Sequence, residues 1–304
     1  MAGLIILFLV AAGLLVIGIS TATIYLMTHP RRLTYAVAIG RGWATSPAEL
    51  GLEHEEEIFS FADGERTPVW KIKGKKEDGP IVIITHGWGD GRYGVLPWVE
   101  QFADFAASVV TYDLRGQGES SAAASRLGTT EVDDLLELVA HVSEANRLIV
   151  LVGLSMGAGI SIAAAARNPG DIAGIVGESA YRRGMQPVAG YFHINRWPLW
   201  PFYHLVGLWL VLRYSSDRAF DRARHAAQLR CPLMLLHGAM DPISPMIAAQ
   251  QIVEAVAESR GRLVEFENGA HLDLMKIDPE RYREGITIFF EDLGASTELK
   301  RRAI

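Results

Sequence analysis

The sequence predicts an α/β fold in which helices cover both faces of a mostly parallel β-sheet. Short apolar runs alternate with helical patterns along most of the chain, and this alternation is typical of parallel strands joined by crossover helices. Several runs, such as Ile81–Thr85, are apolar at consecutive positions, which favours strands buried on both faces. A Gly-x-Ser-x-Gly pattern at Gly153–Gly157 joins one such run directly to a helical pattern. With 304 residues the chain can form one large α/β domain.

The first segment is apolar and uncharged over Leu4–Met27. About 20 apolar residues cross the hydrocarbon core of a bilayer as a helix. A cleaved signal peptide is the alternative, but its charged n-region, short apolar stretch and small-residue cleavage site are missing. We therefore expect residues 1–30 to form a retained single-pass transmembrane anchor. The arginines that follow it, Arg31, Arg32 and Arg41, place the rest of the chain on the cytoplasmic side by the positive-inside rule.

Residues 31–53 are expected to link this anchor to one large domain over residues 54–304. The domain begins with a hairpin, because the turn-forming residues 62–64 separate two strand-like runs at 55–61 and 67–72. Apolar runs predict the remaining strands, and apolar residues at helical spacing predict the helices. Strands are expected at 81–85, 108–112, 148–152, 172–177, 233–236 and 263–266, and helices at about 96–107, 129–142, 160–167, 245–257 and 279–291.

One stretch, at about 182–224, interrupts the alternation of strands and helices. It contains no strand pattern and is rich in aromatic residues, and its apolar run over Leu199–Leu212 is too short for a second membrane span. We expect a cap inserted between two strands. Its aromatic side chains suit an acyl pocket or a bilayer interface, and ordinary packing against the core is an equal alternative.

Composition excludes several classes of protein. The formal net charge is -6 without a basic stripe, which argues against a nucleic-acid partner. Cys231 is the single cysteine, so no intrachain disulfide can form, and its place before an apolar run favours a buried thiol. The nine histidines lack metal-ligand spacing, and we expect neither a metal nor a cofactor. Nothing in the sequence indicates an oligomeric state.

The Gly-x-Ser-x-Gly pattern makes Ser155 the candidate nucleophile. A sharp strand-to-helix turn holds such a serine at the carboxyl edge of a sheet, and it requires small residues two positions before and after. Gly153 and Gly157 meet that requirement. The backbone N–H of Met156 opens the following helix and is a candidate donor to an oxyanion.

A serine hydroxyl needs an adjacent base and an acid that orients the base. His271 follows the last expected strand in a loop of small residues and is the candidate base. Asp241 follows the preceding strand and is the candidate acid. Glu178, just past another strand, is the alternative acid if Asp241 instead caps the helix beginning near Pro245.

A second oxyanion donor is expected in the loop after Ile81–Thr85, which reads His-Gly-x-Gly over His86–Gly89. The backbone N–H of Trp88 would act with that of Met156, and two such donors lower the barrier by several kcal/mol. His86 is expected to brace this loop. His237, at the end of a strand, is expected to pack or form a hydrogen bond there.

With these motifs the chain resembles serine hydrolases of the α/β-hydrolase superfamily over about residues 55–291. Serine, acid and histidine also follow one another in the order of that superfamily. The monoacylglycerol-lipase-like and membrane-anchored BEM46-like branches are the most similar. The segment Asp113–Ser120 resembles the loop after the family's fourth strand, and this resemblance implies structural ions at Asp113 and Arg115. Ala270 and Ala158 stand where the family often has glycine, a difference of loop detail only.

The motifs and the resemblance together imply a membrane-anchored serine hydrolase that cleaves carboxylic esters through an acyl-enzyme on Ser155. The anchor and the aromatic cap favour lipid-like or small-molecule esters as substrates. A peptidase, thioesterase or acyltransferase would use the same triad and stays an alternative. A non-enzymatic membrane scaffold is the remaining alternative, which the intact set of motifs disfavours.

Overall fold

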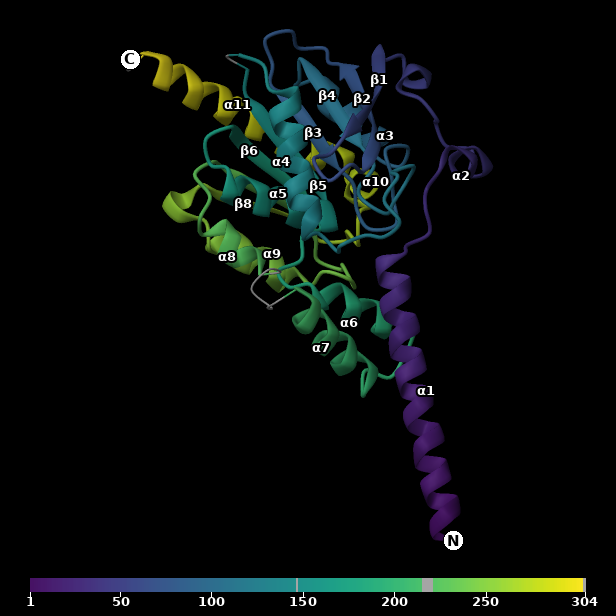
Figure 1. Cartoon of the computed structure of the whole chain (residues 1–304). Helices are drawn as coiled ribbons and strands as arrows, with labels where there is room; N and C mark the ends of the chain where they lie inside the picture. The colour runs from purple at the N-terminus through teal and green to yellow at the C-terminus, as the bar shows by residue number, and fades with distance from the viewer. Residues whose placement is uncertain (146, 215–220, 303–304) are drawn as a thin grey trace.

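The structure, a computed structural model, describes the backbone of residues 1–145, 147–214 and 221–302. A long helix, α1 (Ala2–Thr28), projects from an α/β body, and the two chain termini lie at opposite ends of the molecule (Figure 1). Among the described residues, α1 is the one helix long and apolar enough to cross a membrane, with a mean hydropathy of 2.9.

The body is built on an eight-stranded sheet with the order β1-β2-β4-β3-β5-β6-β7-β8. β1 pairs with β2 and β2 with β4 in antiparallel fashion, and all other pairs are parallel. The parallel strands therefore end at one common edge. The strands are β1 (His54–Ser60), β2 (Arg66–Lys73), β3 (Ile81–Thr85), β4 (Ser108–Tyr112), β5 (Ile149–Leu154), β6 (Ile172–Glu178), β7 (Leu233–Gly238) and β8 (Gly261–Phe266).

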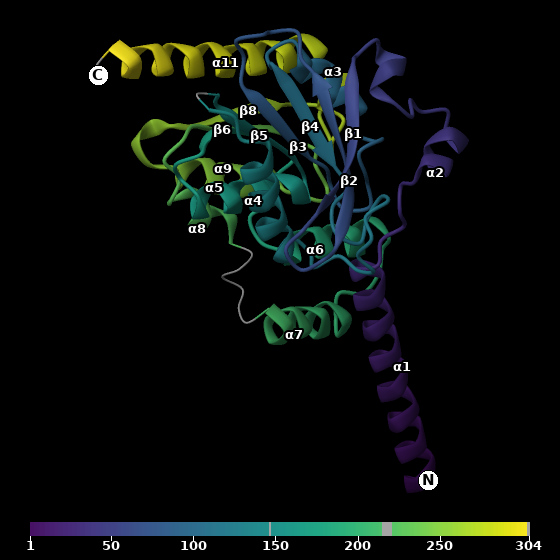
Figure 2. The same cartoon turned by 45° about the horizontal axis from the view of Figure 1, so that its top comes forward.

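Helices cover both faces of the sheet, because alternate residues of the central strands point to opposite sides. Ile81, Ile83 and Leu151 pack on one side, and Val82, Ile84 and Val150 on the other. The first side is covered by α4 (Thr130–Val142), α5 (Met156–Arg167), α8 (Arg222–Ala226) and α9 (Met246–Glu254). The second is covered by α3 (Leu96–Ala103), α10 (Leu274–Ile277) and α11 (Pro279–Arg302), as Figure 2 shows for α3 and α11. The α/β fold class expected from the sequence is confirmed.

Two helix ends differ from the sequence expectation. The helix expected to reach residue 107 ends at Ala103, because the backbone N–H groups of residues 74–76 donate to the carbonyls of Ala103, Ala106 and Ala107 and replace helical bonds there. The last helix continues to Arg302 rather than ending at 291. No proline interrupts that extension, and its one glycine costs only about 1 kcal/mol.

The segment expected as a linker, residues 31–53, lies against the body. It forms α2 (Tyr35–Gly40) and a short 3₁₀ helix, Pro47–Leu50. Leu33 and Leu52 are buried in the core on the α3 side. The guanidinium of Arg32 donates to the carbonyls of Ser120 and Ala122. The body is therefore joined to α1 by an ordered segment.

The insertion after β6 contains α6 (Met185–Ile194), α7 (Phe202–Tyr214) and α8 in its described part. Residues 215–220 of the expected insertion lie outside the described residues. α8 belongs to the helical layer of the body, whereas α6 and α7 form the cap beside α1 (Figures 1 and 2).

Candidate active site

Ser155 lies in the turn between β5 and α5 with a φ of 52° and a ψ of -109°. A non-glycine residue rarely adopts a positive φ, and such strain is typical of functional turns. The residues two positions before and after Ser155 must be glycines. A Cβ on Gly157 would collide with the carbonyl of Thr85, and a Cβ on Gly153 would collide with the backbone of Ala158. The N–H of Ser155 donates to the carbonyl of Glu178 at 2.8 Å. Packing therefore holds this turn in its strained form.

Ser155, His271 and Asp241 lie in one chain of hydrogen bonds. His271 Nε2 is 2.9 Å from Ser155 Oγ, and His271 Nδ1 is 2.7 Å from Asp241 Oδ2. The carboxylate accepts from Nδ1–H, which leaves Nε2 to accept from the serine hydroxyl. Three groups separated by up to 116 residues are thus placed for proton transfer.

Asp241 is held as an ionised carboxylate. Burial alone would raise its pKa, but the hydrogen bond from His271 and those from the N–H groups of Ser244 and Ile243 outweigh burial and lower the pKa. One oxygen therefore caps the turn before α9 while the other bonds the histidine. His237 also supports this turn, because its Nε2 forms a hydrogen bond with the carbonyl of Ser244 at 2.7 Å.

Glu178, the alternative acid, bonds elsewhere. Its Oε2 accepts from Trp98 Nε1 at 2.8 Å and from the hydroxyl of Tyr282 at 2.9 Å. Burial is the main cause that raises its pKa to about 7. The structure therefore joins His271 to Asp241 and assigns Glu178 to a contact with α3 and α11.

The loop after β3 runs close to Ser155. A Cβ added to Gly87 would lie 3.5 Å from the Cβ of Ser155. His86 is fully buried; its Nε2 accepts from the N–H of Leu114 at 2.9 Å, and its Nδ1 lies 2.7 Å from the carbonyl of Gly87. The N–H of Gly89 donates to Gln117 Oε1 at 2.6 Å. His86 and Gln117 thus fix the shape of the loop.

The backbone N–H groups of Trp88 and Met156 donate to no other group in the described part of the chain. Met156 opens α5, where the helix leaves its first N–H groups unbonded. Both groups are thus free to donate to a substrate oxygen.

The side chain of Trp88 makes contacts that the sequence did not indicate. Its indole N–H donates to the carbonyl of Met27 in α1 at 2.8 Å. Its ring packs edge-on against Tyr191 of α6, with 5.9 Å between ring centroids. Trp88 therefore connects the candidate oxyanion loop with both α1 and the cap.

Buried ion pairs support the loops behind this site. Asp113 accepts from the guanidinium of Arg92 at 2.6 Å and from the backbone N–H of Arg92 and Glu119. Arg115 donates two hydrogen bonds to Asp134, at 2.6 and 2.9 Å. The family resemblance implied structural roles for Asp113 and Arg115 but gave no signal for Arg92, whose partner Asp113 lies 21 residues away.

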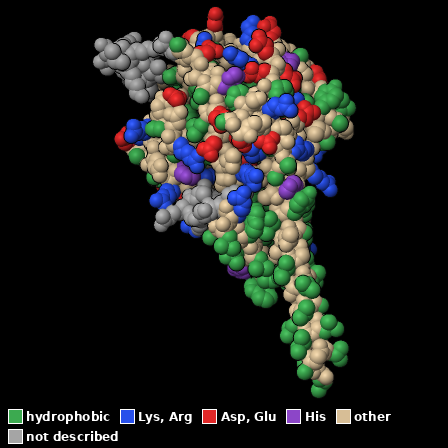
Figure 3. Space-filling model, in the orientation of Figure 1, with side chains coloured by type: hydrophobic (Ala, Val, Ile, Leu, Met, Phe, Trp, Pro, Cys, Tyr) green, Lys and Arg blue, Asp and Glu red, His purple; other side chains and the backbone are tan. Residues whose placement is uncertain are grey.

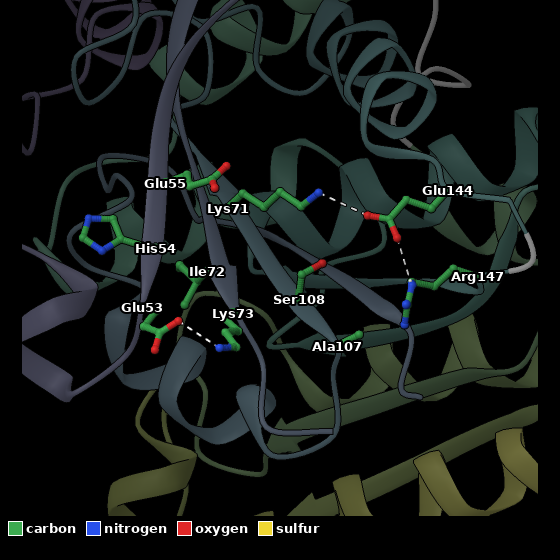
Figure 4. Close-up of a pocket in the computed structure, with 10 residues that line it drawn as sticks. All are labelled: Glu53, His54, Glu55, Lys71, Ile72, Lys73, Ala107, Ser108, Glu144 and Arg147. Carbon is green, nitrogen blue, oxygen red and sulfur yellow. Dashed lines mark hydrogen bonds and ion pairs between the residues drawn. The ribbon is translucent and has the colours of Figure 1, made fainter. Parts of the chain in front are cut away.

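A surface hollow of about 420 Å³ lies at the other end of the sheet (Figure 4). It is lined by β1, β2 and the start of β4, and Glu144 bonds both Lys71 and Arg147 there. These exposed ion pairs satisfy one another, and none of the candidate catalytic residues reaches this hollow. Among the described residues, no group of three or more His, Cys, Asp or Glu side chains is arranged to hold a metal ion.

The chain is similar to known hydrolases in sequence and in fold. The family model described as "Serine aminopeptidase, S33" matches residues 76–213, which include the β3 loop and the Ser155 turn. The esterase Pf2001 of Pyrococcus furiosus superposes with a TM-score of 0.69 at 19% identity, over 88% of this chain and 98% of that chain. The fold is that of the α/β hydrolases, and the family match over residues 76–213 supports membership of that superfamily.

The chain is also similar to proteins whose names describe them as membrane proteins. It is 24% identical over 261 residues to the membrane protein YNL320W of Saccharomyces cerevisiae, covering 84% of this chain and 86% of the relative. It is 25% identical over 224 residues to YqkD of Bacillus subtilis, covering 71% and 73%. A membrane phospholipase A superposes with a TM-score of 0.60 at 20% identity, over 96% of this chain and 97% of that chain. The yeast relative fits the membrane-anchored BEM46-like branch, and the family model and structural neighbours support hydrolase chemistry for this α/β-hydrolase.

Proposed function

We propose that this protein is a membrane-anchored serine hydrolase that cleaves carboxylic esters through an acyl-enzyme on Ser155. The observation that carries the proposal is the continuous hydrogen-bond chain from Ser155 Oγ through His271 to Asp241. Two backbone N–H groups without a partner among the described residues also support it: that of Met156, next to the serine, and that of Trp88, next to Gly87 in the loop beside the serine.

The reaction follows from these contacts. Ser155 Oγ attacks the ester carbonyl carbon while His271 Nε2 takes its proton, and Asp241 stabilises the imidazolium that forms. The N–H groups of Trp88 and Met156 donate to the negative oxygen of the tetrahedral intermediate. His271 then gives its proton to the leaving alcohol as the ester bond breaks. A water molecule, deprotonated by His271, attacks the acyl-enzyme, releases the carboxylic acid and restores Ser155.

Membrane anchoring is proposed from α1. Its 27 residues span about 40 Å, which exceeds the roughly 30 Å of a bilayer's hydrocarbon core. Most of its large apolar side chains are exposed, and the name of the yeast relative agrees with this assignment. The arginines that follow α1 favour the cytoplasmic side for the catalytic body.

The test uses the full chain reconstituted in phosphatidylcholine vesicles. The substrates are nitrophenyl esters with short, medium and long acyl chains, matched thioesters and aminoacyl amides. We expect ester turnover that falls by about 10³-fold or more in Ser155→Ala and His271→Ala. Ser161→Ala, which changes a buried serine in α5, the helix that follows Ser155, is the matched control and should keep its activity.

Peptide-bond cleavage by the same triad is the second candidate, because the matched family model is that of serine aminopeptidases. Turnover of aminoacyl amides without turnover of esters would favour it and refute the ester assignment. Equal turnover by wild type and Ser155→Ala would refute both.

A further inference from the structure

The cap exposes a large apolar surface beside α1. It comprises Leu208, Val211 and Leu212 of α7 with Leu199 and Trp200 of the preceding turn, and we refer to these five residues as the cap surface. Leu212 is 75% and Trp200 76% exposed. Exposed apolar patches of this kind mark sites of contact with a protein or a membrane.

The opposite side of α7 is buried. Val206 and Leu210 lie one helical turn apart and pack in one cluster with Ile24 and Met27 of α1. Figures 1 and 2 both show α7 beside the C-terminal part of α1. α7 is therefore apolar on two sides, and contacts within the chain cover only one of these sides.

The place along α1 at which α7 packs determines the depth of α7 in a bilayer that α1 spans. Ser20 is 5% exposed, and Ile24 and Met27 after it are half-buried, so the body and cap cover one side of α1 from about Ser20 onward. Tyr25 and Leu26, on the other side, stay exposed.

The part of α1 before Ser20 is about 18 residues, or ~27 Å, long. The hydrocarbon core needs ~30 Å. If α1 spans the bilayer from its first residue, the hydrocarbon core ends near Thr21, and the membrane interface lies at the level of Ile24 and Met27, on which α7 packs.

The charge of the cap agrees with such a position. Residues 185–213 contain no Asp or Glu, and their charged residues are Arg196 and Arg213. Figure 3 shows apolar side chains along α1 and on the neighbouring end of the body, whereas acidic side chains gather farther from α1. Tryptophan and arginine beside an apolar helix face are typical of segments that lie in a membrane interface.

We propose that the cap surface docks into the lipid leaflet at which α1 enters the body, with α7 lying in the interface. The inference rests on the proposed anchoring by α1 and deepens the proposed function. The buried side of the cap adjoins Trp88 and Tyr191, and Trp88 belongs to the loop beside Ser155. Docking would therefore bring the candidate site to the leaflet surface, and an ester resident in that leaflet is the substrate class the arrangement fits.

Depth-dependent quenching tests the docking directly. Single cysteines replace Leu212 in the cap, Leu14 in α1 and Glu55 on β1, in a full-length Cys231→Ala background. Each is labelled with bimane, and the protein is reconstituted in phosphatidylcholine vesicles that contain lipids with a nitroxide on the acyl chain. We expect quenching at positions 212 and 14 and none at position 55.

Other patterns of quenching distinguish failure of the docking from failure of the anchor. Quenching at position 14 without quenching at 212 would refute the docking and leave the anchor intact. No quenching at either position would refute the anchor and the docking together. A label at 212 that is shielded both from the nitroxide lipid and from aqueous iodide would show that a second copy of the chain covers the cap surface, and would refute the proposal.

Turnover adds a second readout. Leu208→Asp/Leu212→Asp should keep the wild-type rate on a water-soluble short-chain ester, which also shows that the variant is folded. It should lower turnover of an ester dissolved in the vesicles by about tenfold or more, because the affinity of the cap for lipid falls. Ile58→Asp, at an exposed apolar residue on β1, is the matched control and should change neither rate. Equal rates for the double variant and wild type on the vesicle ester would refute the proposal.

Discussion

The indole N–H of Trp88 donates a hydrogen bond to the backbone carbonyl of Met27 in the last turn of α1. A helix leaves its last carbonyls without intrahelical donors, and here the body supplies two of them, since the N–H of Ser125 also bonds the carbonyl of Thr28 at 2.8 Å. α1 is therefore fastened to the body next to the loop that carries the candidate oxyanion donor.

Trp88→Phe should uncouple the loop from α1 without removing the catalytic donor, which is a backbone N–H. The variant keeps an aromatic ring for the edge-on contact with Tyr191 and loses one hydrogen bond, worth about 1 kcal/mol. We expect a lower melting temperature and a fall in kcat of less than about tenfold. Trp43→Phe, at a half-exposed tryptophan, is the control. A loss of activity as large as that of Ser155→Ala would contradict the assignment of the donor to the backbone.

Gly157→Ala should disrupt the turn that holds Ser155. The added Cβ would collide with the carbonyl of Thr85, and overpacking of this kind costs about 1–3 kcal/mol or more. Gly170→Ala, where no atom lies within 4 Å of the added Cβ, should change stability by less than about 0.5 kcal/mol. Thermal unfolding of the two variants checks this difference, and equal melting temperatures would show that the turn is not packed as described.

Arg92→Met should be one of the most destabilising changes behind the site. It would leave Asp113, which is fully buried, without its charged partner, and such a loss costs about 3–5 kcal/mol. The exposed pair Lys73–Glu53 gives the comparison, because Lys73→Met should cost no more than about 1 kcal/mol. Denaturant unfolding measures both values, and a small effect of Arg92→Met would indicate that Asp113 is compensated by other groups.

Glu178→Gln should change how stability depends on pH. In the folded protein burial raises the pKa of Glu178 from 4.5 to about 7, so the folded state holds this proton after the unfolded state has lost it. Stability therefore falls as pH rises from about 4.5 to 7, by at most about 3 kcal/mol from this group. A glutamine does not titrate, so the variant does not lose this stability. The difference in melting temperature between the variant and wild type should therefore grow from about pH 4.5 to 7 and stay constant at higher pH. A difference between the two proteins that does not vary with pH would contradict the raised pKa.

The candidate triad could be predicted because its signals are local. A strand, a strained glycine-flanked turn and a helix identify Ser155, and parallel strands bring their carboxyl ends to one edge, where Asp241 and His271 also lie. The sequence favoured Asp241 but left Glu178 as an alternative acid. The choice between them depends on Trp98 and Tyr282, which lie 80 and 104 residues from Glu178 and occupy its carboxylate. The catalytic roles themselves stay predictions that kinetics must test.

The cap and the anchor show a second limit of sequence reasoning. The apolar patterns of α1 and α7 were visible separately, but the sequence left open whether the cap faces a pocket, the core or lipid. Packing of Val206 and Leu210 against α1 settles which side of α7 is covered within the chain. The hydrogen bond from Trp88 to Met27, 61 residues away, could likewise not be predicted without knowing where α1 lies. Contacts between distant segments leave no local pattern in the sequence from which they could be predicted.

Covalent labelling tests most directly whether Ser155 is an activated nucleophile. A fluorophosphonate reacts covalently with such a serine, and mass spectrometry of the digested protein identifies the modified residue. We expect one adduct on Ser155 in wild type, much slower labelling of His271→Ala and none of Ser155→Ala. An adduct on a different residue, or labelling that persists in Ser155→Ala, would contradict this role of Ser155.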